Sequence, residues 1–319
     1  MTRLAILDDY QNVALQMADW QSLGSAVAIE VFHDTLSDQD ALVERLRDFE
    51  IIVAMRERTP FRAPLLERLG NLKLLVTTGM RNASIDLKAA VERRILVCGT
   101  DVVPTSTVEL TWGLILDVAR HISREDQGMR SGRWQTTVGT GLEGRVLALL
   151  GLGNLGGRVA AIGNAFQMKV IAWSPNLTAE RAASLGVERV EKQELFRRAD
   201  YLSIHVVLSS RSRNLVDAPE LAAMKPTACL INTSRGPIVN EQALIAALES
   251  RKIAGAALDV YDQEPLPADH GLRRLDNVVL TPHLGYVTVE NFNQMYGQAV
   301  EDIRAFLDGH PIRIVSAVY

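Results

Sequence analysis

The sequence predicts an α/β protein of two domains, in which a doubly wound parallel sheet is inserted into a discontinuous first domain. Three observations predict this class. The 319 residues are enough for two hydrophobic cores. Short apolar runs alternate with segments of helical spacing through almost the whole chain. Residues 145–166 join an apolar run, a glycine-rich turn and an amphipathic segment, in the order strand, turn and helix.

Residues 1–102 alternate predicted strands and helices. The pattern predicts strands at residues 4–7, 27–32, 51–54, 72–76 and 95–98, and helices at residues 38–49 and 63–69. Polar loops follow two of these strands, at residues 55–60 and 77–82. Both loops are candidates for a ligand pocket, because ligands bind beyond the carboxyl ends of strands in open α/β sheets. The turn at Gly79 offers backbone N–H groups to a carboxylate. For Arg56, Arg58 and Arg81 the alternative is a solvated surface position.

The middle of the chain leads from the first domain into the second. Residues 104–123 predict one long apolar helix, and the polar, glycine-rich residues 132–144 predict a loop. Residues 146–150 are continuously apolar, as in a strand buried on both faces of a sheet. We therefore expect the second sheet to begin with this strand.

Three glycines follow that strand in the pattern Gly-X-Gly-X-X-Gly. Gly151 permits the tight turn, Gly153 lets the backbone approach a pyrophosphate, and Gly156 lets the helix pack closely on the strand. The N-terminus of the helix presents N–H groups and a positive dipole end to phosphates. The stretch therefore predicts a dinucleotide site, with a purely structural turn as the alternative.

The alternation continues to the end of the second domain. The pattern predicts strands at residues 169–173, 187–190, 201–205, 228–232, 256–260 and 278–280, and helices at residues 179–185, 192–198 and 240–250. A last helix is expected at residues 288–308, ended by Gly309 and Pro311. We expect it to return to the first domain, followed by an extended segment at residues 312–318. The predicted domains are residues 1–102 with 287–319, and residues 103–286.

The composition, 47% hydrophobic and 23% charged with a net charge of −4, is typical of a globular protein in water. Lys and Arg are scattered among acidic residues, which argues against nucleic-acid and anionic-lipid partners. No apolar run reaches the roughly 18 residues of a membrane span, and the N-terminus lacks the apolar segment of a signal peptide. Cys98 and Cys229 are far apart and without metal-ligand spacing. We expect no metal, no membrane and a cytoplasmic location.

Three segments follow predicted strands of the second domain and carry side chains that can take part in catalysis, at residues 231–236, 258–265 and 281–285. Arg235 offers a planar, bidentate partner to a carboxylate. His283 is of the residue type that gives and takes protons near neutral pH. Glu264 would hold the imidazole and favour its charged form. Taken alone, a histidine after Thr-Pro would be a capped loop residue.

With the glycine turn, these segments resemble the D-isomer-specific 2-hydroxyacid dehydrogenase family over essentially the whole chain. The resemblance implies a Rossmann-type domain inserted into a flavodoxin-like substrate domain, NAD or NADP as cofactor, a homodimer, and a small 2-hydroxy or 2-keto acid as substrate. It implies an oxidoreductase, of which the glyoxylate or hydroxypyruvate reductases are one type. The alternative is a dinucleotide-sensing, corepressor-like interaction protein on the same fold.

The resemblance also assigns roles to residues. It implies Arg235, Glu264 and His283 as the catalytic residues. The implied cofactor-binding residues are Thr111, Gly151, Gly153, Asn154, Leu155, Gly156, Ser174, Pro175, Val206, Thr233, Ser234, Asp259 and Gly285. The implied substrate-binding residues are Arg56, Thr78, Gly79, Met80 and Tyr286. A turn cap is the alternative for Asp259, and His205 is interpreted as structural.

Three places depart from the pattern of the family, and one of them is residues 205–209, where the family usually has a proline after the apolar residues. An acidic residue normally ends the second strand and binds the adenosine ribose, but Ser174 and Pro175 stand there. Without a carboxylate to repel a 2′-phosphate, we expect relaxed selectivity between NAD and NADP. Tyr286 stands where a smaller residue is common, and its phenol should reshape the substrate pocket.

Overall fold

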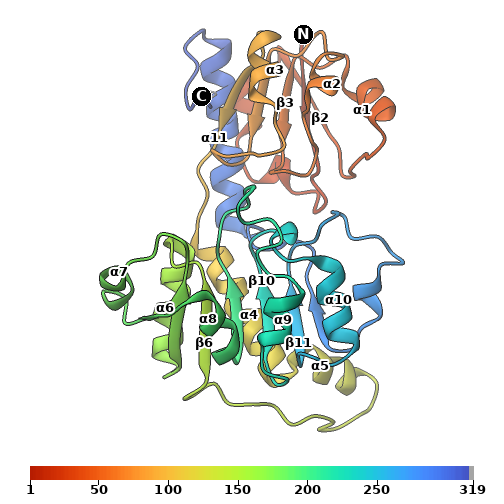
Figure 1. Cartoon of the computed structure of the whole chain (residues 1–319). Helices are drawn as coiled ribbons and strands as arrows, with labels where there is room; N and C mark the ends of the chain where they lie inside the picture. Colours follow the sequence, from red (N-terminus) through yellow and green to blue (C-terminus); the bar gives the residue numbers. More distant parts are fainter. Residues whose placement is uncertain (316–319) are drawn as a thin grey trace. The chain divides into compact units, whose positions relative to one another are not determined.

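The computed structural model describes residues 1–315 and divides into two compact units (Figure 1). One unit contains Met1–Val103 together with residues 287–315, and the other contains Pro104–Tyr286. Each unit is a parallel sheet with helices, so the predicted α/β class is confirmed. Within residues 1–315, no helix has both the length and the apolar composition needed to cross a bilayer.

The first unit contains a five-stranded parallel sheet. Its strands, in spatial order, are β2 (Val27–Val31), β1 (Thr2–Ile6), β3 (Ile51–Ala54), β4 (Leu74–Thr77) and β5 (Leu96–Gly99). This order is the flavodoxin-like one. β3 and β4 are buried along their whole length, which explains their continuous apolar sequences. The helices of this unit before residue 100 are α1 (Gln39–Leu46), α2 (Ala63–Leu66), α3 (Leu87–Glu92), η1 (Ala14–Gln16) and η2 (Trp20–Leu23).

The last helix, α11 (Val289–Leu307), packs against β4 and β5 of the same sheet. The residues after it are held by an ion pair in which Arg313 Nε lies 2.9 Å from the carboxylate of Asp302, a fully buried residue of α11. Ile314 forms an antiparallel bridge with Cys98 in β5. Of the extended segment expected at residues 312–318, the described part is not continuously extended, because Arg313 has a φ of 47°, and residues 316–318 lie outside the described residues.

The second unit contains a seven-stranded parallel sheet. Its strands, in spatial order, are β12 (Val278–Leu280), β11 (Gly255–Leu258), β10 (Cys229–Asn232), β9 (Tyr201–Ile204), β6 (Val146–Leu150), β7 (Lys169–Trp173) and β8 (Glu188–Arg189). The chain winds outward from β6 in both directions, which makes the sheet doubly wound and Rossmann-type. Its helices are α4 (Thr105–Arg120), α5 (Ile122–Arg130), α6 (Asn154–Ala165), α7 (Ala179–Ala183), α8 (Lys192–Arg198), α9 (Ala218–Ala223), α10 (Glu241–Glu249), η3 (Gly236–Ile238) and η4 (Gly271–Arg274).

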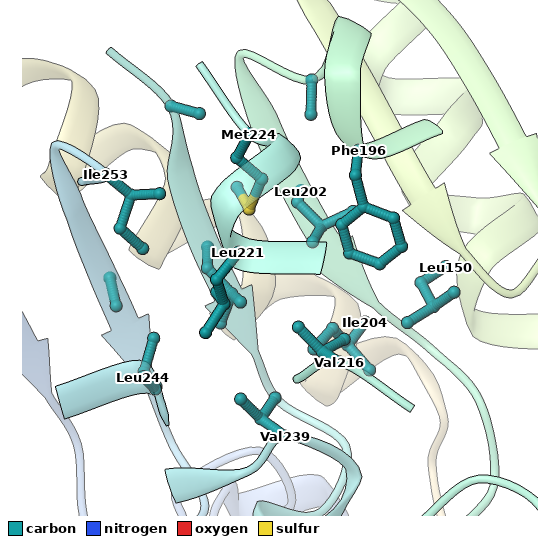
Figure 2. Close-up of a cluster of buried hydrophobic side chains, with 14 of the residues drawn as sticks. Leu150, Phe196, Leu202, Ile204, Val216, Leu221, Met224, Val239, Leu244 and Ile253 are labelled. Atoms are coloured by element: carbon teal, nitrogen blue, oxygen red, sulfur yellow. The ribbon is translucent and has the colours of Figure 1, made fainter. Parts of the chain in front are cut away.

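Two apolar layers cover the two faces of this sheet. Successive side chains of β6 point to opposite faces, so Ala148 and Leu150 join one layer, whereas Leu147 and Leu149 join the other. The first layer contains residues of α8, α9 and α10, and Figure 2 shows some of its side chains, including Phe196 of α8. The second layer contains residues of α4 and α6. Because both faces are covered, ligands can reach this sheet only at its edges and strand ends.

The prediction of a single helix at residues 104–123 is wrong, because the structure has two helices there. α4 ends at Arg120, and α5 begins at Ile122. His121 between them has a φ of 55°, in the left-handed region, which ends an α-helix. Asp117 stabilises the break, since its carboxylate accepts a hydrogen bond of 2.9 Å from the backbone N–H of Ser123.

Candidate active site

The glycine turn connects β6 to α6. Gly151 has a φ of +107°, and a Cβ there would lie 2.8 Å from backbone atoms of His205. A Cβ on Gly156 would lie 2.2 Å from the carbonyl oxygen of Gly151. Both glycines are therefore required by the packing of the protein itself. A Cβ on Gly153, in contrast, would meet no atom within 4 Å.

The open position at Gly153 is the feature that fits a dinucleotide. Gly153 is the N-cap residue of α6, and no side chain caps the helix there. The first N–H groups of a helix need partners, and together with the helix dipole they favour an anion. Packing does not explain the missing side chain of Gly153, but the close approach of a pyrophosphate does. We conclude that this turn fits the phosphates of a dinucleotide.

The other residues predicted to bind the cofactor follow parallel strands of the same sheet and therefore lie at one edge of it. Ser174 and Pro175 follow β7, Val206 follows β9, and Thr233 and Ser234 follow β10. The hydroxyl of Ser234 donates a 2.6 Å hydrogen bond to the carbonyl oxygen of Val206, which joins two of these strand ends.

Three further predicted residues lie on α4 and α6. Thr111 on α4 is fully buried, and its Oγ1 is 2.8 Å from Oγ1 of Thr233. Asn154 and Leu155 form the first turn of α6. Leu155 packs against the apolar layer that contains α4 and α6. The structure thus gives Thr111 and Leu155 packing partners within the unit, and their contacts with a cofactor stay a prediction.

His205, which directly follows β9, packs against the glycine turn. Its Nε2 lies 2.8 Å from the hydroxyl of Ser203, and its Cβ lies 3.5 Å from the position that a Cβ on Gly156 would occupy. Burial lowers the pKa of His205 to about 4, so the ring is neutral at pH 7. This side chain has the packing of a structural residue.

Glu264 and His283 form a close pair. Nδ1 of His283 lies 2.6 Å from Oε2 of Glu264, and the two side chains are only 14% and 22% exposed, in the order His283 and Glu264. The other carboxylate oxygen of Glu264 accepts a 3.0 Å hydrogen bond from the backbone N–H of Tyr261. A carboxylate on Nδ1 fixes the proton there and directs the acid–base chemistry of the ring to Nε2. His283 has a φ of 55°, in the left-handed region, which is uncommon for residues other than glycine.

Asp259 anchors the loop that contains His283. Its carboxylate is fully buried and accepts hydrogen bonds from the Thr281 hydroxyl at 2.6 Å, the Leu284 N–H at 2.7 Å and the Gly285 N–H at 2.9 Å. Burial raises the pKa of Asp259, and these hydrogen bonds oppose the rise. The contacts are those of a turn cap, which was the alternative interpretation of Asp259. A role of Asp259 and Gly285 at the cofactor stays a prediction.

Arg235 lies directly before η3 and has an extended backbone. Its Nη1 donates a 2.7 Å hydrogen bond to the carbonyl oxygen of Ser234. A Cβ on the next residue, Gly236, would lie 2.1 Å from the carbonyl carbon of Tyr261. Gly236 therefore packs the segment of Arg235 directly onto the segment that contains Glu264.

Tyr286 lies beside His283. The ring centroids of the two residues are 5.7 Å apart, with the rings at 75° in an edge-on arrangement, and Tyr286 is 9% exposed. The phenol therefore covers part of the imidazole instead of pointing away from it. This contact supports the expected effect of Tyr286 on the surroundings of His283.

The predicted substrate residues of the first unit also lie together. Nη1 of Arg56 donates a 2.9 Å hydrogen bond to the carbonyl oxygen of Thr78, and the Arg56 N–H donates one of 2.8 Å to the Thr78 hydroxyl. Gly79 has a φ of +128°, and a Cβ there would lie 2.0 Å from Arg56 Nη1. The N–H of Gly79 donates to the hydroxyl of Thr100 at 3.0 Å, so this N–H serves the fold and is not offered to a ligand. Met80, the next residue, is 41% exposed.

Sequence reasoning missed several residues that hold these loops. Thr100, Thr281 and Tyr261 make the contacts described above, and Thr107 on α4 donates a 2.8 Å hydrogen bond to the carbonyl oxygen of Gly285. Thr100 and Thr281 each directly follow a strand, which is the one sequence signal that could have identified them. Thr107 lies within α4, and its partner is 178 residues away in the sequence.

Replacing Gly156 by alanine tests the glycine turn. The added Cβ would collide with the carbonyl oxygen of Gly151, so we expect a loss of about 1–3 kcal/mol in the free energy of unfolding and weaker binding of NADH. Gly157→Ala is the matched control, because its Cβ would make an ordinary contact 3.4 Å from Leu185 and the helix would gain about 0.5–1 kcal/mol. Urea unfolding and NADH fluorescence measure both effects. Equal behaviour of the two variants would contradict the steric role of Gly156.

The known proteins most relevant to this chain are dehydrogenases and reductases. The family model described as D-isomer specific 2-hydroxyacid dehydrogenase, NAD binding domain, matches residues 112–285. The hydroxypyruvate reductase of Thermotoga maritima is 35% identical over 298 residues, which cover 92% of this chain and 95% of that protein. The D-3-phosphoglycerate dehydrogenase of Methanocaldococcus jannaschii is 36% identical over 85% of this chain, which spans about half, 52%, of its length.

A solved structure has the same fold over nearly the full length. The crystal structure of a phosphoglycerate oxidoreductase from Vibrio cholerae matches with a TM-score of 0.92 and 36% identity, covering 97% of this chain and 100% of the other. The residues matched by the family model include the glycine turn, Arg235, Glu264 and His283. The chain belongs to the D-isomer specific 2-hydroxyacid dehydrogenase family.

Proposed function

We propose that the protein is a nicotinamide-dependent oxidoreductase that interconverts a small 2-hydroxy acid and the corresponding 2-keto acid. The observation that supports this most strongly is the 2.6 Å hydrogen bond between His283 and Glu264 at the edge of the sheet where Arg235 and the glycine turn also lie. One relative of the chain is named for hydroxypyruvate, a 2-keto acid. Hydroxypyruvate and glyoxylate are therefore the first substrates to test.

Each of the three residues has a defined task in this proposal. Arg235 binds the carboxylate of the substrate and donates toward its carbonyl oxygen. Glu264 holds Nδ1 of His283 and stabilises the charged imidazole. In reduction, His283 gives the Nε2 proton to the carbonyl oxygen, and in oxidation it takes the hydroxyl proton back. A bound nicotinamide supplies the hydride in one direction and accepts it in the other.

We assign the remaining predicted residues to ligand binding. Arg56, Thr78, Gly79 and Met80 of the first unit are candidates for contact with the substrate, with Arg56 as the cation, and Tyr286 of the second unit would shape the surroundings of His283. Their support is the packing of Arg56 on Thr78 and Gly79, and of Tyr286 on His283.

For the cofactor, we propose that the glycine turn holds the pyrophosphate and that Ser174 and Pro175 face the adenosine ribose. Because neither residue carries a negative charge, NADP is accepted as well as NAD. The absence of an acidic residue at the end of β7 supports this relaxed selectivity.

A panel of 2-keto acids with NADH and NADPH, followed by absorbance, tests the proposal. We expect reduction of at least one small 2-keto acid, with comparable kcat/KM for the two cofactors. A strong preference for NADH would contradict the proposed cofactor selectivity. Binding of a dinucleotide without turnover of any 2-keto or 2-hydroxy acid would instead support a dinucleotide-sensing protein.

His283→Ala is the control variant for this panel. Removing a general acid costs about 10²–10⁴-fold in rate, so we expect turnover to be almost lost. Binding of the dinucleotide, measured by fluorescence, should be unchanged, because the glycine turn is intact. Full activity of this variant would refute the role of His283.

We also propose a homodimer formed through the second unit. Large apolar side chains are exposed on α5 and the segment that follows it, with Trp134 at 73% and Val138 at 92%. Met129 and Ile122 on α5 are also exposed, at 54% each. Side chains of this kind favour a protein interface. Light scattering should give a dimeric mass for the wild type and a smaller mass for Trp134→Glu, and a monomeric wild type would contradict the proposal.

A further inference from the structure

The loop that contains Glu264 is held at both ends by one carboxylate of another element. Glu241, the first residue of α10, places Oε1 3.0 Å from Nε2 of His270. Its Oε2 accepts a longer hydrogen bond, of 3.4 Å, from the backbone N–H of Asp262. Asp262 and His270 flank Glu264 in the sequence. Glu241 therefore forms hydrogen bonds with both ends of the segment 262–270, which contains Glu264.

The ring of His270 makes two hydrogen bonds of opposite sense. Nδ1 accepts one of 3.3 Å from the backbone N–H of Leu272, which caps η4. The ring proton therefore resides on Nε2, where it is donated to Glu241. The side chains of His270 and Glu241 are only 18% and 15% exposed, respectively. His270 thus joins three elements: the end of the loop, η4 and α10.

The carbonyl groups of the same loop are also fixed. Arg273 in η4 donates hydrogen bonds of 2.9 Å and 2.8 Å to the carbonyl oxygens of Pro267 and Leu266. Because His270 caps the start of η4, it also helps to fix the position of Arg273 within η4. The anchors at both ends and in the middle leave Glu264 little freedom to move.

The charged groups around Glu241 and His270 include Asp262 and Arg213. Burial raises the pKa of Asp262, and the neighbouring carboxylate of Glu241 raises it further. Arg213 and His270 act in the opposite direction. Glu241 therefore lies between a second carboxylate and a hydrogen-bond donor, and Arg213 together with His270 offsets the repulsion between the two carboxylates.

We propose that Glu241 and His270 are positioning residues that keep Glu264 on Nδ1 of His283. The inference rests on the proposed function for its kinetic consequences. A hydrogen bond as short as 2.6 Å depends on geometry held within about 0.5 Å. A displacement of about 1 Å at such a site costs up to about 10²-fold in rate. Loss of the contact at either end of the loop should therefore weaken the hydrogen bond between Glu264 and His283 and leave the glycine turn unchanged.

Two substitutions of His270 separate its two hydrogen bonds. His270→Gln keeps an N–H donor within reach of Glu241, whereas His270→Asn keeps an acceptor for Leu272 and is too short to reach Glu241. We expect His270→Asn to lower kcat about tenfold, with little change in KM or in dinucleotide binding. Its pH profile of reduction should move to lower pH, in the direction expected for Glu264→Gln, which removes the charge beside His283. His270→Gln should keep the profile of the wild type, and Glu241→Ala should behave like His270→Asn.

A double variant tests whether the effect passes through Glu264. In the background of Glu264→Gln, His270→Asn should cause no further change in the pH profile, because the contact that it positions is already altered. Additive effects would overturn the proposal. So would a wild-type kcat and pH profile in His270→Asn, or an equal loss in the Asn and Gln variants.

A spectroscopic measurement keeps the two proposals distinguishable. The Nδ1 proton of His283, in a hydrogen bond of 2.6 Å, should give a strongly downfield resonance in the NMR spectrum of the wild type and of His270→Gln. We expect the resonance to shift or vanish in His270→Asn. If no acid is turned over but the resonances differ in this way, the proposed function fails and the positioning role stands. Identical resonances in all three proteins would overturn the positioning role, whatever the activity.

Discussion

The site depends on a hydrogen bond of 2.6 Å between Nδ1 of His283 and the carboxylate of Glu264. Its two partners come from loops that follow β12 and β11, two strands whose parallel pairing places both loops at one edge of the sheet. Each loop has its own anchor. Asp259 holds the His283 loop through three hydrogen bonds, and Glu241 contacts both ends of the Glu264 loop. The geometry of the pair is thus set by buried polar contacts outside it.

Most of the fold could be predicted because strands buried on both faces are continuous apolar runs. The predicted bounds of β3 and β7 agree with the structure at both ends. The break at His121 could not be predicted, because the apolar spacing continues past it and a left-handed residue leaves no periodic signal. The helices α3 and α9 were also missed. Each has only six residues, too few for a clear period, although Asp86 and Asp217 cap them.

The candidate site could be predicted only in part. Arg235, Glu264 and His283 each lie in short motifs beyond predicted strands, so sequence order alone placed them at one edge of the sheet. Their supports left no such signal, because Glu241 and His270 are 29 residues apart and meet only through packing. At Gly79 the sequence suggested a backbone N–H for a ligand, but Thr100, 21 residues away, takes it. Local patterns identify which residues react, and long-range contacts determine which groups are already engaged.

The most direct test of the role of the pair is the pH dependence of 2-keto acid reduction in Glu264→Gln. Glutamine keeps the size of the side chain and removes the charge that stabilises the protonated imidazole. Reduction needs that proton, so its rate falls as the pH rises and His283 loses it. We predict that this falling limb lies at lower pH in the variant than in the wild type. A limb at the same pH in both proteins would contradict the role of Glu264.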